Sequence, residues 1–136
     1  MKKGCFNCIL LLLLFYQSAA QEQLLFKTYS FAQGLNSYNI FKTRQDAFGF
    51  IWVATQDGLF RFNGRSFEVL KSNAGSDNST MGNVLSDLEI GTDNKVYTAD
   101  YYYGVDIIDA ASWRINYIGS DGKTAYKLPN YWIEKV

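Results

Sequence analysis

The chain has 136 residues, 13 basic and 13 acidic side chains, and no histidine. Balanced charge without a basic stripe excludes a nucleic-acid footprint. The lack of histidine excludes Ser-His-Asp and Cys-His catalysis, histidine-ligated zinc and a phosphoaccepting histidine within this chain. Aromatic residues make up 17% of the chain and favour strands, so we predict a β-rich protein of at most one small domain.

The N-terminus has the order of a signal peptide. Lys2-Lys3 is a short basic region, residues 9–16 are apolar, and Ser18-Ala19-Ala20 supplies small residues for cleavage before Gln21. The apolar run is shorter than the roughly 20 residues of a membrane span. We therefore predict a signal peptide over residues 1–20, with an uncleaved anchor as the alternative.

The two cysteines of the chain lie inside this segment. Cys5 and Cys8 precede the apolar core, whereas lipidation requires a cysteine just after it. Their Cys-x-x-Cys spacing superficially suggests a redox or metal site, but cleavage removes it. We expect a mature chain without cysteine, which enters an oxidising compartment without a disulfide.

Alternating residues and tight turns then predict a meander. Residues 24–30 read as a lone strand, and four further strands are expected at 38–45, 50–55, 59–62 and 66–71. Asp57-Gly58 and Asn63-Gly64 take the positive φ angles of tight hairpin turns. The strand around Trp52 is apolar on both faces, which favours a sheet covered on both sides. We define residues 38–71 as the first unit.

The pattern returns about 45 residues later, after a polar linker. Residues 83–118 form the second unit, with strands expected at 83–90, 95–99, 104–109 and 113–118. Four-stranded units with a period of 40–50 residues are typical of β-propellers. We predict an all-β fold of two four-stranded antiparallel propeller blades. The alternative is two unrelated meanders in one all-β domain.

Both ends of this region predict an incomplete propeller. Residues 129–136 read as the first strand of a third, truncated blade, and the strand at 24–30 would close the last blade of the ring. Propellers typically close with 4–8 blades. We therefore expect further blades in the same parent chain, and poor solubility of residues 21–136 alone.

The first unit resembles the two-component regulator propeller repeat. The matching segments are Gly34-Leu35-Asn36 and Asp46-x-x-Gly49-Phe50-Ile51-Trp52-Val53-Ala54-Thr55-x-Asp57-Gly58-Leu59-x-Arg61. The second unit departs from the pattern, with Lys95-Val96-Tyr97 in place of Gly-x-Ile-Trp. The resemblance implies the periplasmic sensor of a regulator anchored in the inner membrane, commonly a histidine kinase or hybrid kinase of Bacteroidetes-type bacteria. It also implies a homodimeric full-length receptor.

Two functions follow. The first is an extracytoplasmic sensor of an extracellular small molecule or oligosaccharide, with the kinase outside this chain, which is itself no enzyme. The alternative is a secreted β-propeller that binds its target or acts on glycans without a kinase. No cofactor and no metal is expected, because the aspartates lie in turn contexts and lack the dense ligand pattern of calcium loops.

Two groups of residues are candidates for function. Tyr101, Tyr102 and Tyr103 follow one another at a turn of the second unit and could stack on sugar rings or fill an interface. The alternative is that two of them pack against the neighbouring blade. Asp87 and Glu89 alternate on an innermost strand and either face a central channel or form a solvated strand face.

Overall fold

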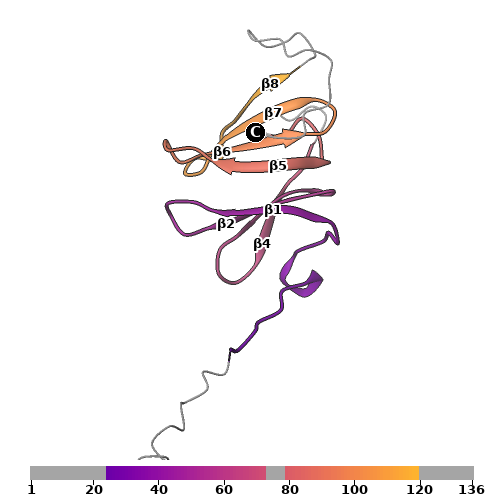
Figure 1. Cartoon of the computed structure of the whole chain (residues 1–136), viewed down its shortest axis with the longest axis vertical. Coiled ribbons are helices and arrows are strands. Elements are labelled where there is room, and N and C mark those ends of the chain that lie inside the picture. Colours follow the sequence, from indigo (N-terminus) through magenta and orange to yellow (C-terminus); the bar gives the residue numbers. More distant parts are fainter. Residues whose placement is uncertain (1–23, 73–78, 120–136) are drawn as a thin grey trace, which may run out of the picture.

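The computed structural model describes residues 24–72 and 79–119 (Figure 1). The predicted signal peptide and the predicted strand of a third blade lie outside these residues. The described residues contain a short 3-10 helix, η1 (Phe31–Gln33), and eight strands in two sheets of four. The all-β prediction is confirmed.

Each sheet is an antiparallel meander in chain order. The first contains β1 (Ile40–Gln45), β2 (Ile51–Thr55), β3 (Gly58–Phe62) and β4 (Phe67–Leu70), and the second contains β5 (Leu85–Ile90), β6 (Lys95–Asp100), β7 (Gly104–Asp109) and β8 (Ile115–Gly119). Strand ends differ by at most two residues from those expected. The turn between β2 and β3 is Gln56-Asp57 rather than the expected Asp57-Gly58, because Gly58 already pairs with Thr55 as the first residue of β3. The local signals still located the strands, because hairpin turns and two-residue alternation act within a few residues.

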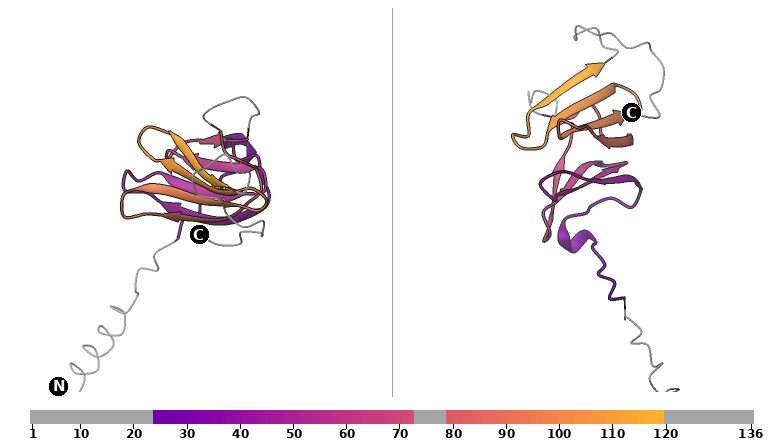
Figure 2. Two further views of the ribbon diagram at one scale, coloured as in Figure 1. Left: turned by 90° about the horizontal axis from the view of Figure 1, so that it is seen from above. Right: turned by 60° about the vertical axis from the view of Figure 1, so that its left-hand side comes forward.

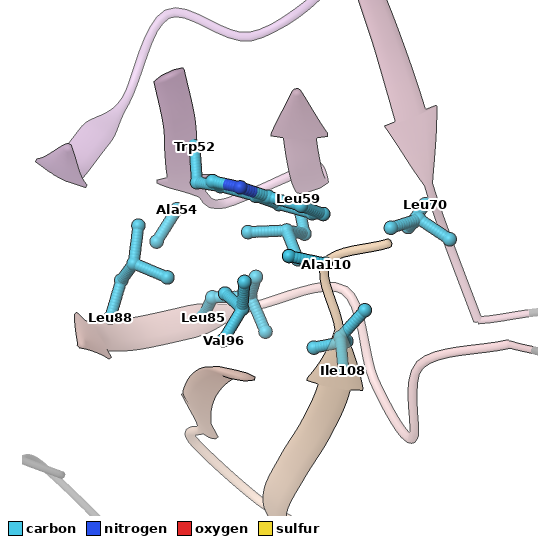
Figure 3. Packing of buried hydrophobic residues seen from close by; sticks show 9 residues of the cluster. All are labelled: Trp52, Ala54, Leu59, Leu70, Leu85, Leu88, Val96, Ile108 and Ala110. Atoms are coloured by element: carbon cyan, nitrogen blue, oxygen red, sulfur yellow. The ribbon is translucent and has the colours of Figure 1, made fainter. Parts of the chain in front are cut away.

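The two sheets stack face to face, with β1 beside β5 (Figures 1 and 2). Their shared core is apolar and is shown in Figure 3. Its buried members are Trp52, Ala54, Leu59 and Leu70 from the first sheet and Leu85, Leu88, Val96, Ile108 and Ala110 from the second. Burial of this apolar surface holds the sheets together.

The opposite face of the first sheet is covered by the N-terminal segment. Val53 and Phe60 pack there with Leu35, and the Tyr29 ring lies 4.6 Å from the Phe62 ring. Residues 24–30 form no strand in the structure, and Tyr29 packs on the sheet face instead. A strand requires a hydrogen-bonded neighbour, so the closing role of this segment stays a prediction.

The first strand of each sheet carries a bulge at the equivalent position of the repeat. The register of β1 against β2 shifts between Ile40 and Lys42, and that of β5 against β6 shifts between Leu85 and Asp87. The extra residues are Phe41 and Ser86. A bulge redirects a side chain out of the regular alternation, and both bulges lie at the same end of the stacked sheets.

Candidate functional site

A groove of about 370 Å³ opens between the sheets at the end that carries the bulges. Both sheets contribute to it: β1 and β5 supply the bulged residues, and the turn between β6 and β7 supplies tyrosines. The lining residues are Phe41, Val84, Leu85, Ser86, Tyr101 and Tyr102. We call this site the aromatic groove.

The bulges and the turn give the groove accessible aromatic walls. Phe41 is 51% exposed and Tyr102 is 61% exposed, whereas Leu85 is fully buried and forms the floor. The Ser86 hydroxyl donates to the Ala99 carbonyl oxygen at 3.3 Å. The groove therefore combines exposed rings with a hydroxyl and an apolar base.

The tyrosine turn is held by hydrogen bonds to its backbone. The Tyr101 amide donates to the Val84 carbonyl oxygen at 2.9 Å. Asp100 Oδ1 accepts from the amides of Tyr102 and Tyr103 at 2.9 and 3.0 Å. These bonds fix where the rings lie, because side-chain capping of this kind replaces backbone pairing at turns.

The structure separates the three predicted tyrosines. Tyr101 and Tyr102 line the groove, and their rings meet edge to face with centroids 5.1 Å apart. Tyr103 lies beside Tyr102, with ring centroids 6.4 Å apart, but is not a lining residue. Whether these tyrosines bind a ligand stays a prediction.

Asp87 and Glu89 take part in ion pairs between the sheets. Lys42 Nζ lies 2.6 Å from Asp87 and 3.0 Å from Glu89, and Arg44 makes two bonds to Glu89 at 2.6 and 2.8 Å. Hydrogen bonds from Arg44 and then Lys42 lower the pKa of Glu89 to about 2. Both carboxylates thus form ion pairs that connect the two sheets. The two expectations for this strand face, a central channel or a solvated surface, did not include such pairs.

A second hollow, of about 350 Å³, lies at the opposite end of the stacked sheets, and Arg61 is among its lining residues. The Arg61 guanidinium carbon lies 4.3 Å from the Phe50 ring centroid and 3.7 Å from that of Trp113. Its Nη2 also pairs with Glu68 at 2.9 Å. Phe50 directly precedes β2 of the first sheet, and Trp113 lies between β7 and β8 of the second. The cation–π contacts of Arg61 therefore connect the two sheets.

Asp46, which the sequence places at a turn, has a structural role. Asp46 Oδ1 accepts from the amides of Phe48 and Phe50, and Asp46 Oδ2 accepts from Trp52 Nε1 at 2.7 Å.

Within residues 24–72 and 79–119, no three His, Cys, Asp or Glu side chains gather as a metal site. The same residues include no helix long and apolar enough to cross a membrane.

Sequence reasoning missed the bulged residues and a buried acid. Phe41 and Ser86 are 45 residues apart, so the repeat alignment contained a signal, but nothing in it marked a bulge. Asp106 lies between Val105 and Ile107 on β7 and is fully buried. In the sequence, the only indication of this buried acid was a charged residue between two apolar ones.

Comparisons with known proteins found partial matches to a histidine kinase and to a solved domain of a hybrid two component system. No model of a known protein family matches it. It is 34% identical over 71 residues to Histidine kinase P4 of Formosa agariphila, a match that spans 52% of this chain and 5% of that protein. The solved extracellular domain of a hybrid two component system from B. thetaiotaomicron matches 78% of this chain and 21% of that chain, with 18% identity and a TM-score of 0.45. The chain is thus similar over half its length to a small part of a histidine kinase.

Proposed function

We propose that the chain is the extracytoplasmic ligand-sensing part of a two-component regulator and that the aromatic groove is its ligand site. The observation that carries this proposal is the groove itself, which two bulges and a tyrosine turn build from both sheets. The sequence match to part of a histidine kinase supports the signalling role. The kinase belongs to another part of the parent protein, which is anchored in the inner membrane and acts as a homodimer.

The lining predicts an uncharged ligand. No charged side chain is among the described residues of the groove, and its volume lies within the roughly 300–1,000 Å³ of ligand pockets. The faces of Phe41 and Tyr102 suit the apolar face of a ring, and tyrosine and serine hydroxyls suit its polar substituents. A neutral oligosaccharide or a ring-shaped small molecule has this chemistry.

The position of the groove suggests how binding becomes a signal. Phe41 belongs to the first sheet and Tyr102 to the second. A ligand that contacts both binds one relative arrangement of the sheets better than others, and this difference in affinity shifts the population. The shift is then passed to the dimer and across the membrane.

The test is binding of a panel of neutral and acidic oligosaccharides by calorimetry to the full chain and to three variants. Phe41→Ala and Tyr102→Ala each remove a wall of the groove. Each should weaken binding of the compound that the wild type binds by at least about fivefold, since stacking contacts contribute roughly 1–3 kcal/mol. Phe48→Ala is the matched control, because Phe48 is a 59% exposed aromatic residue at the opposite end. Unchanged affinity in both groove variants would show that the ligand binds elsewhere.

A further inference from the structure

Two aspartates are buried together beneath the tyrosine turn. Asp100 is 1% exposed and Asp106 is 0% exposed. Asp106 pairs across the strands with Thr98, which lies two residues before Asp100 on β6, so the three side chains share the face turned toward the first sheet. Burial of two carboxylates is costly unless they are paired or lose their charge.

Their hydrogen bonds join the groove to the linker between the sheets. Asp100 Oδ1 accepts from the amides of Tyr102 and Tyr103, as described above. The Met81 amide lies 3.1 and 3.4 Å from the two oxygens of Asp106. One carboxyl thus holds the tyrosine turn, and the other holds the linker.

Several oxygens of this cluster lack the partners that burial demands. Asp100 Oδ2 and the hydroxyl oxygens of Thr98 and Thr80 have no hydrogen-bond partner among the described residues. Asp100 also lies against the linker glycine, since a Cβ added at Gly82 would be 1.9 Å from Asp100 Oδ2. The unpartnered carboxylate oxygen of Asp100 indicates a missing donor, and a proton on one carboxyl supplies one.

No cation among residues 24–72 and 79–119 acts on either carboxyl. Burial, followed by the charge of Asp100, raises the pKa of Asp106 to about 7 against the lowering effect of the Met81 amide. Asp100 is the one charged group that acts on it among the described residues. Two other titratable groups belong to neighbouring elements. Tyr117 on β8 is the cross-strand neighbour of Asp106 in the strand register, and Asp77 of the linker lies outside the described residues. The first sheet presents apolar side chains to this face.

We propose that Asp100 and Asp106 share one proton and act as positioning residues for the tyrosine turn, so that the shape of the aromatic groove depends on pH. With one proton present, the pair carries a single negative charge and the tyrosine amides keep their acceptor. Without it, two buried charges repel each other, and the turn and the linker separate. The consequence for ligand binding rests on the proposed function, whereas the shared proton does not.

The experiment follows the amide proton shifts of Tyr102 and Tyr103 by NMR in the ligand-free full chain, between about pH 5 and 9. The wild type should show one titration step near neutral pH. Asp106→Asn keeps the shape and supplies a permanent N–H donor, so the step should disappear. Asp109→Asn should keep it, because Asp109 also caps a turn, through Ala111 and Ser112, but at the opposite end of β7.

Two results would overturn the proposal. One is a flat response of both tyrosine amides in the wild type, and the other is a step that persists in Asp106→Asn. If Asp106→Asn does not fold, the carboxyl carbon shift of Asp106 in the wild type decides instead, since it must titrate in the same range. Because no ligand is present, failure of the proposed sensor function would leave these results unaffected.

Discussion

Trp52→Ala should remove most of the stability of the stacked sheets. Trp52 is fully buried between them and packs in the shared core with Leu88 and Val96. Replacing a buried tryptophan by alanine costs about 3–5 kcal/mol. Small domains have net stabilities of about 5–15 kcal/mol, so this loss is large enough to unfold a marginal one.

The hydrogen bond of Trp52 adds a second cost. Its Nε1 donates to Asp46 Oδ2 at 2.7 Å, and Asp46 is itself buried. Removing the donor leaves a buried carboxylate oxygen unpaired, which costs about 1–3 kcal/mol. Trp52→Phe keeps much of the apolar contact but loses this donor, so it should show a smaller loss than Trp52→Ala.

Urea unfolding followed by circular dichroism measures both losses. From highest to lowest, the expected order of midpoints is wild type, then Trp52→Phe, then Trp52→Ala. Phe48→Ala serves as the control, since an exposed substitution should change the free energy of unfolding by no more than about 0.5 kcal/mol. A Trp52→Ala protein with the wild-type midpoint would refute the assignment of Trp52 to the shared core.

Three further outcomes are expected. Arg44 and Lys42 lower the pKa of Glu89, so the contribution of Glu89 to stability is complete above about pH 4.5 and is lost as the pH falls toward 2. Glu89→Gln should therefore make the free energy of unfolding less dependent on pH in this range, as measured by circular dichroism. Gly104→Ala should lower the melting temperature, because Gly104 has φ +149° and an added Cβ would lie 2.1 Å from the Ile118 carbonyl oxygen; an unchanged melt would contradict the tight approach of β7 and β8. Cleavage after Ala20 should leave Gln21 as the N-terminal residue in sequencing of the exported protein, and retention of the leader would contradict the predicted signal peptide.

The candidate site could be predicted only in part. The sequence singled out Tyr101 and Tyr102 because three tyrosines in a row at a turn are unusual, and both line the groove. It did not reveal Phe41, because a bulge depends on how two strands pair rather than on either strand alone. The buried position of Asp106 was equally hidden, since turn chemistry explains most of the other aspartates.

The sequence by itself determined the strands, their turns and their order. Gly58 and Gly64 mark the two turns locally through their positive φ angles, and two-residue alternation specifies which side chains share a face. The tertiary structure decided which faces meet. Only stacking brings Lys42 to Asp87 and forms a groove between β1 and the β6–β7 turn, because these contacts join residues about 45 or more positions apart and depend on how the two sheets pack.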